Sequence, residues 1–279
     1  MDNIKRLSSL LKGLPTTRGD RDSVTGGENV VLFITGAGLS KASGIPTYRS
    51  NVSEPLRNRQ SKREREDTDS ATWSRFVYQW GTRAQFLKDP LAWYNTFWLQ
   101  THHRKEYLEA EPSKGHISIA KLCKLFPAVR VVTQNIDGLH SKGAGAIEEN
   151  KIVEVHGHLT YYKCINEDCV AQDETFRHIS LEYGDKSNTK CKTNTLRKVP
   201  ICPKCKDVLL PQSLFFDEDY ESHPFYQYEK VETWMESCKA VVFIGTSNSV
   251  GITTNAVLEA RRRSIPVRSY FTPLKFKYL

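Results

Sequence analysis

The chain has 279 residues, of which 39% are hydrophobic and 10% aromatic. This is enough apolar material for a buried core, so a mainly disordered chain is excluded, and no apolar run reaches the roughly 18 residues that a membrane helix needs. The net charge of +8 is scattered along the chain. Its two short basic runs, at 62–65 and 261–263, are typical of solvated surface, so direct nucleic-acid binding is not supported.

The N-terminal segment and the seven cysteines bear on the compartment. Lys5, Arg6 and Lys12 interrupt every apolar stretch near the start, which is unlike a secretory signal. We therefore expect an intracellular, reducing compartment, the nucleus or the cytoplasm, where paired cysteines are metal ligands rather than disulfides. Leucines at helical spacing within 7–14 leave a mitochondrial presequence as the alternative. Asp2 argues against it, and a short helix docking on the domain explains these leucines as well.

Residues 1–29 are expected to be a flexible N-terminal segment, and the first buried strand follows them. The run 30–34 is continuous, apolar and rich in β-branched residues, which is typical of a strand buried on both faces of a parallel sheet. Similar runs recur at 129–132, 241–244 and 265–267. Helical stretches around 118–125 and 256–263 separate them. This alternation predicts the α/β class, with a doubly wound, Rossmann-like parallel sheet.

Three segments interrupt this alternation. Residues 51–70 are charged and poor in apolar residues, so we expect a mobile loop or insertion. Residues 73–98 are dense in aromatics and are expected to form a small helical module packed over the sheet. Residues 161–207 hold five of the cysteines and little apolar periodicity, which predicts an inserted module stabilised by a metal. The expected boundaries are a Rossmann-like domain at 30–160 and 208–279, including the charged loop and helical module at 51–115, and a zinc-binding domain at 161–207.

A glycine-rich turn follows the first strand, at Gly36-Ala37-Gly38. Between a strand and a helix, such a turn lets backbone N–H groups approach a pyrophosphate. A tight turn without a ligand explains a lone G-x-G equally well, and the third glycine of the usual dinucleotide motif is absent. The stretch 44–49 then adds a rigid turn, an aromatic residue and an arginine.

Polar residues follow two later strands. Gln134, Asn135 and Asp137 come after the run 129–132, where open α/β sheets bind ligands. Each alone is explained as a helix N-cap, but three together favour a binding site. His156 follows a further apolar stretch, and its ordinary pKa near neutrality suits a general base. A lone histidine is nevertheless more often structural.

Four cysteines have the spacing of a zinc ribbon: Cys164, Cys169, Cys202 and Cys205. Cys191 lies between the two pairs and is the alternative to one ligand of the first pair. A redox role for the second pair is not expected without a thioredoxin-like context. Cys123 and Cys238 are interpreted as buried core thiols.

Together these motifs resemble those of the sirtuin family. The patterns Gly-Ala-Gly-x-Ser, Gly-Ile-Pro-x-(Phe/Tyr)-Arg, Thr-Gln-Asn-Ile-Asp-x-Leu-His, a later His-Gly and a further Gly-Thr-Ser are matched in order and spacing across residues 30–267. The resemblance implies an NAD-dependent protein-lysine deacylase, expected to be a deacetylase. It would transfer the acyl group to ADP-ribose, giving nicotinamide, free lysine and O-acyl-ADP-ribose. NAD would be the co-substrate, zinc a structural ion, and an acylated-lysine protein the partner.

The resemblance also implies roles for individual residues. The NAD loop would be formed by Gly36, Ala37, Gly38, Ser40, Ile45, Pro46, Tyr48 and Arg49. Nicotinamide and its ribose would be held by Gln134, Asn135, Ile136 and Asp137, and the adenosine side by Gly245, Thr246 and Ser247. His156 would be the catalytic base, with Asn135 and Asp137 also catalytic. The acyl-peptide groove would be lined by Leu214, Phe215, Phe216 and Glu218.

Two positions depart from the family pattern, Asp217 and Phe271, and a third comparison concerns the acyl group. Asp217 stands where the family usually has Gly, which leaves the shape of the groove open. Sirtuins that prefer succinyl or malonyl groups carry a Tyr-x-x-Arg pair that binds the acyl carboxylate. The matching positions here hold Phe97 and Gln100, or Trp98 and Thr101 with a shift of one residue. We therefore expect a neutral acyl group such as acetyl or a longer chain. Phe271 stands where an Asn contacts the adenosine ribose, which predicts weaker NAD binding. The alternative is a truncated or alternative end in which Tyr270 or Phe271 stacks on the adenine.

Two other functions compete with this interpretation. An NAD glycohydrolase or ADP-ribosyltransferase on the same scaffold would use the same NAD loop and His156 but no acyl-lysine groove. A catalytically weak NAD-binding scaffold is a different class of protein, and the presence of His156, Asn135 and Asp137 argues against it. The zinc module and the aromatic groove segment favour the deacylase. Nothing in the sequence predicts the oligomeric state.

Overall fold

A computed structural model of the protein describes residues 9, 11, 30–46, 75–184, 195–246 and 251–270. Several predictions lie outside these residues: those for the charged loop, for most of the N-terminal segment, and for Tyr48, Arg49, Cys191, Ser247 and Phe271. Among the described residues, no helix combines the length and apolar character needed to cross a bilayer.

The chain divides into two compact units. The first unit comprises residues 1–45, 110–156 and 226–279, and the second comprises residues 46–109 and 157–225. The aromatic helical segment therefore groups with the cysteine-bearing segment 161–207. From the sequence we had predicted that it belongs to the domain of the parallel sheet. The physical reason is aromatic packing and hydrogen bonding within the second unit. The rings of Trp93 and Phe215 lie 5.5 Å apart, and the Tyr94 hydroxyl donates to Leu209 O at 2.7 Å.

The first unit is built on a five-stranded parallel sheet. Its strands are β1 (Val30–Thr35), β2 (Val129–Thr133), β3 (Ile152–Glu154), β6 (Cys238–Ile244) and β7 (Val267–Tyr270), in the order β3-β2-β1-β6-β7. Every residue of β1 is buried, as its apolar run predicts. The strand order reverses at β1. Open α/β sheets bind ligands beside such a reversal, at the carboxyl ends of the strands.

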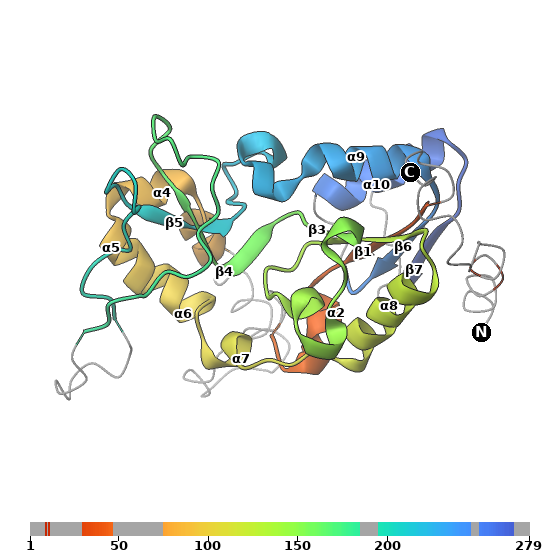
Figure 1. Cartoon of the computed structure of the whole chain (residues 1–279), viewed down its shortest axis with the longest axis horizontal. Coiled ribbons are helices and arrows are strands. Elements are labelled where there is room, and N and C mark those ends of the chain that lie inside the picture. Colours follow the sequence, from red (N-terminus) through yellow and green to blue (C-terminus); the bar gives the residue numbers. More distant parts are fainter. Residues whose placement is uncertain are drawn as a thin grey trace, which may run out of the picture. The chain divides into compact units, whose positions relative to one another are not determined.

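Helices cover both faces of this sheet. The long ones are α8 (Lys114–Leu125), α9 (Tyr228–Ser237) and α10 (Gly251–Arg262), and in Figure 1 α9 and α10 are drawn above the strands and α8 below them. The buried side of α8 contributes Ile119 and Cys123 to the core that also contains Val31 and Phe33. This architecture confirms the doubly wound α/β prediction.

Short helices fill the connections of the first unit. They are α2 (Ala37–Ser40) and 3-10 helices at Lys41–Ser43, Leu139–Ser141, Gly143–Gly145 and Glu149–Lys151.

The basic run at the end of α10 is bound within the unit. Arg262 pairs with Glu259 at 2.7 Å, and Arg263 donates to the carbonyl oxygens of Met235 and Cys238. These contacts agree with its interpretation as helix surface.

The second unit combines an aromatic helical segment with a small antiparallel sheet. Residues 75–80 are helical, followed by α4 (Arg83–Lys88), α5 (Pro90–Trp93), a π-helix at Tyr94–Trp98, α6 (Leu99–Thr101) and α7 (Lys105–Leu108). Strands β4 (Gly157–Cys164) and β5 (Leu209–Ser213) pair antiparallel, and 3-10 helices follow at Tyr220–Ser222 and Pro224–Tyr226. Trp93 and Trp98 are buried and stacked, with ring centroids 5.8 Å apart. The aromatics of the helical segment therefore supply the core of this unit.

Candidate functional site

The glycine-rich turn after β1 packs against the loop after β6. The Gly36 N–H donates to Ile244 O at 3.0 Å, and the Gly38 N–H donates to Gly245 O at 2.8 Å. A Cβ atom at Gly36 or Gly38 would lie 2.9 or 2.8 Å from Gly245 backbone atoms, and one at Gly245 would lie 2.3 Å from Leu39 N. Gly245 also has a φ of +67°. All three glycines are therefore needed for the ends of β1 and β6 to meet.

A polar network joins this turn to the segment after β2. The Ser40 hydroxyl donates to Asp137 Oδ2 at 2.6 Å, and the Asn135 amide donates to Ser40 Oγ at 2.9 Å and to Gly36 O at 3.1 Å. Asp137 Oδ1 accepts the N–H of Leu139 at 3.0 Å. The structure thus brings together the predicted residues Ser40, Asn135 and Asp137, with each side chain held by at least two hydrogen bonds.

Gln134 connects three strand ends. Its backbone N–H donates to Thr35 O at 2.9 Å, and its side-chain amide donates to Thr35 O at 3.3 Å and to Thr246 Oγ1 at 3.2 Å. The ends of β1, β2 and β6 are therefore linked by one residue. Thr246, one of the predicted adenosine-side residues, is buried within this arrangement.

His156 lies two residues after β3, and Nδ1 donates to the backbone oxygen of Gln134 at 2.9 Å. Burial lowers the pKa of His156 to about 4, against the smaller opposing effect of that hydrogen bond. The imidazole is therefore neutral at pH 7. Because Nδ1 carries the proton donated to Gln134, the lone pair of the neutral ring lies on Nε2. This is the protonation state that a general base requires.

Two further histidines, which the sequence did not single out as site residues, lie behind the network. His140 is buried and its Nε2 hydrogen-bonds Thr35 Oγ1 at 3.2 Å, and the ring of His116 lies 4.8 Å from it. Burial lowers the pKa of His140 to about 3 and also lowers that of His116. His116 Nδ1 accepts the N–H of Ser113 in a capping box that begins α8. A serine three residues before a histidine at a helix start is the sequence signal that could have indicated it.

The other predicted cofactor residues are placed as follows. Ala37 and Ile136 are half-buried, whereas Ile45 is buried and donates its N–H to Ser40 O at 3.3 Å. Pro46 is half-buried and belongs to the second unit. Ala37 and the network residue Ser40 belong to the same short helix, α2.

The second unit brings the four predicted zinc ligands together. The sulfur atoms of Cys164, Cys169, Cys202 and Cys205 all lie within 4.8 Å of one another. Two of the sulfur pairs are 3.5 and 3.8 Å apart. Zinc bound tetrahedrally at about 2.3 Å requires sulfurs about 3.8 Å apart, so the cluster fits this ion. Cys123 and Cys238 are buried elsewhere, and burial raises the pKa of each to about 11, as expected for core thiols.

The predicted groove segment follows β5. Phe215 is buried and Leu214 half-buried, whereas 55% of Phe216 is exposed. Glu218 forms a buried ion pair with Lys163, whose Nζ lies 2.7 Å from the carboxylate. Burial lowers the pKa of Lys163, and the charge of Glu218 opposes this shift. Lys163 was not predicted, because no local pattern marks a contact between residues 55 positions apart.

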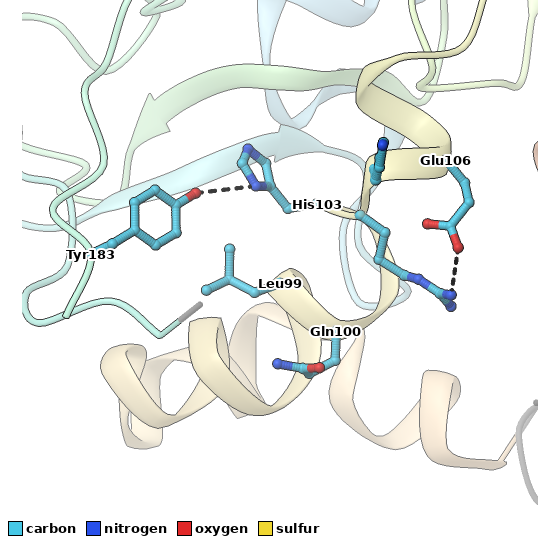
Figure 2. Close-up of a pocket in the computed structure, with 7 residues that line it drawn as sticks. Leu99, Gln100, His103, Glu106 and Tyr183 are labelled. Atoms are coloured by element: carbon cyan, nitrogen blue, oxygen red, sulfur yellow. Dashed lines mark hydrogen bonds and ion pairs between the residues drawn. The ribbon is translucent and has the colours of Figure 1, made fainter. Parts of the chain in front are cut away.

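A cavity of about 250 Å³ opens in the second unit. Figure 2 shows Gln100, Leu99, His103 and Tyr183 around it, with Tyr183 hydrogen-bonded to His103 at 3.3 Å. A larger cavity of about 480 Å³ shares His103 and Tyr183. The described residues lining the two cavities include none of the predicted NAD, zinc or groove residues.

Comparisons with known proteins agree with this geometry. The Sir2 family model matches residues 36–251. NAD-dependent deacetylase sir2E of Dictyostelium discoideum is 42% identical over 83% of this chain, which spans 62% of that relative's length. NAD-dependent protein deacylase 1 of Caldanaerobacter subterraneus subsp. tengcongensis is 31% identical over 78% of this chain and 72% of its own.

Solved structures share the fold. A Sir2 homolog–NAD complex has a TM-score of 0.59 at 22% identity, covering 87% of this chain and 78% of that one. The structure of Sir2Tm bound to a propionylated peptide has a TM-score of 0.59 at 19% identity, covering 98% and 89%. With the family model matching most of its length, the chain belongs to the Sir2, or sirtuin, family.

Proposed function

We propose that the chain is an NAD-dependent protein-lysine deacylase acting on acylated-lysine proteins. Family membership and relatives named NAD-dependent deacetylase and deacylase support this activity. The observation that carries the proposal is His156, a neutral imidazole with its lone pair on Nε2, hydrogen-bonded to the residue that precedes Asn135.

The proposed NAD site is the turn 36–40 with the network after β2 and the loop after β6. Both N–H bonds of the Asn135 amide are used within the protein, so Asn135 can offer a ligand only its carbonyl oxygen. Ser40 and Asp137 hold each other in place. Such preorganised side chains orient a bound nicotinamide ribose without further reorganisation.

The chain's own chemical contribution is then proton transfer and positioning. NAD, when bound, would supply an electrophilic ribose carbon for the acyl oxygen of the substrate lysine, with nicotinamide as the leaving group. Nε2 of His156 would accept the proton of a ribose hydroxyl, and this would allow the hydroxyl oxygen to attack the acyl carbon. Water completes the release of free lysine, and the acyl group remains on ADP-ribose. Asn135 and Asp137 hold the reacting ribose in this scheme.

The zinc ion has a structural role in this proposal. The four sulfurs would supply all the ligands of a tetrahedral zinc ion, which would leave no open position for water or substrate. Cys202 and its three partners instead connect β4 to the loops of a segment with little core of its own. An intracellular location, in the nucleus or cytoplasm, remains part of the proposal and rests on the interpretation of the paired cysteines as metal ligands.

Mass spectrometry of the products formed from NAD and an acetyl-lysine peptide tests the activity. We expect O-acetyl-ADP-ribose, nicotinamide and deacetylated peptide in equal amounts. Free ADP-ribose with intact acetyl peptide would support the glycohydrolase instead, and an ADP-ribosylated peptide would support the transferase.

A further inference from the structure

We propose that Asp217 is a positioning residue that ties the groove segment 214–218 to the start of α4 and so preorganises it for the acylated peptide. The inference rests on the proposed function of this segment. The family pattern usually has glycine here, and glycine has no side chain with which to form such a tie. The tie is therefore a property of this chain's own residues.

The Asp217 carboxylate binds two backbone N–H groups at the first turn of α4. Oδ1 accepts the N–H of Arg83 at 2.7 Å, and Oδ2 accepts the N–H of Ala84 at 2.9 Å. These groups have no partner within the helix, and a carboxylate is favoured at a helix start. The N–H of the next residue, Gln85, donates to Oγ1 of Thr82 at 3.1 Å, and Thr82 is the N-cap residue of α4. Asp217 and Thr82 thus cap one helix, but only Asp217 belongs to the groove segment.

The neighbours of Asp217 are held as well. The N–H of Phe216 donates to Gly81 O at 3.0 Å, and a Cβ atom at Gly81 would lie 2.9 Å from the Phe216 ring. Glu218 is paired with Lys163 and also accepts the N–H of Phe215 at 3.1 Å. The residues from Phe216 to Glu218 therefore each bind a partner outside the segment.

The segment held in this way presents an aromatic surface. Phe216 is 55% exposed, and its ring lies 4.5 Å from that of Tyr78, which is 63% exposed. A rigid pair of exposed rings can bind an extended peptide with little loss of conformational entropy. Without Asp217, only the contacts with Gly81 and Lys163 would hold the segment. Peptide binding would then have to order it further, which weakens the apparent affinity. The first-unit residues proposed to bind NAD would be unaffected.

Steady-state kinetics of Asp217→Ala, with Thr82→Ala as the matched control, tests this role. Both changes remove a cap from α4, so both should lower the unfolding midpoint. Only Asp217→Ala should raise KM for an acetyl-lysine peptide, by about five- to tenfold, with kcat and KM for NAD within about twofold of wild type. Asp217→Asn, which keeps one acceptor oxygen, should recover part of the peptide KM.

An unchanged peptide KM in Asp217→Ala, or an equal rise in Thr82→Ala, would overturn the proposal. Amide hydrogen exchange gives a readout that does not depend on activity. The N–H of Phe216 should exchange at least tenfold faster in Asp217→Ala and at the wild-type rate in Thr82→Ala. If the wild type itself fails to deacylate any peptide, the proposed function fails. In that case an unchanged rate of amide hydrogen exchange at Phe216 in Asp217→Ala would separately refute the proposed role of Asp217.

Discussion

Replacing Lys163 by Met is expected to destabilise the fold severely. The Lys163 and Glu218 side chains are only 4% and 5% exposed, and Nζ lies 2.7 and 2.8 Å from the two carboxylate oxygens. The substitution keeps the apolar stem but leaves the carboxylate buried without a counter-charge. Removing one partner of a buried pair costs about 3–5 kcal/mol of the free energy of unfolding. Because native domains are stable by only about 5–15 kcal/mol, this is a large fraction of the total free energy of unfolding.

Urea unfolding of the zinc-loaded protein measures this loss. The double variant Lys163→Met with Glu218→Gln is the control, because a neutral amide still offers an acceptor to the N–H of Phe215 without a buried charge. It should recover about half or more of the loss, since replacing both charges of a buried pair is often close to neutral. A loss below about 1 kcal/mol in the single variant, or no recovery in the double, would refute the argument from burial.

Three further predictions follow from the described sites. One zinc ion should bind per chain, and Cys191→Ser should retain it in metal analysis; loss of zinc would mean that one of the four clustered cysteines is not a ligand. The acetyl group should be removed faster than the succinyl group from lysine in the same peptide. Phe97 and Gln100 offer no cation for a succinyl carboxylate, and Arg104, which lines the same cavity as Gln100, is paired with Glu106 at 2.8 Å. Faster removal of succinyl in competing-substrate kinetics would contradict this prediction. The pKa of His140, lowered to about 3 in the fold from its ordinary 6.5, means that the unfolded chain takes up the proton first as the pH falls. Stability from this group is therefore complete above pH 6.5 and declines below it, by at most ~1.4 kcal/mol per pH unit. Urea unfolding at pH 7.5, 6.5 and 5.5 should show that the free energy of unfolding declines more steeply with falling pH in wild type than in His140→Asn. Equal slopes in the two proteins would contradict this role of His140.

The strands of the parallel sheet could be predicted because each is marked by the composition of a short local stretch of sequence. Strand β1 is a continuous apolar run, and the strands that flank it are mainly apolar, interrupted by Arg130 and Lys239. Burial on both faces of a parallel sheet favours that composition. The polar residues after β2 were also predictable, since the ends of adjacent parallel strands must meet. Four cysteines in two close pairs indicated the metal cluster for a similar reason.

Long-range partners could not be predicted in the same way. Lys163 appears within a strand as an ordinary polar residue, and only the fold brings Glu218 to it. The sequence shows that Asp217 departs from the family pattern. It does not indicate that the Asp217 carboxylate caps a helix that begins 134 positions earlier. The grouping of the aromatic helices with the cysteine-bearing segment depends on ring packing such as that of Trp93 on Phe215. Such contacts join positions whose separation in sequence carries no periodic signal.

The most direct test of the central claim compares wild type with His156→Ala, measuring O-acetyl-ADP-ribose formed from NAD and an acetyl-lysine peptide. General base catalysis contributes about 10²- to 10⁴-fold, so we predict a loss of that size with NAD affinity, measured by calorimetry, within a few-fold of wild type. Near-normal product formation by His156→Ala would contradict the account.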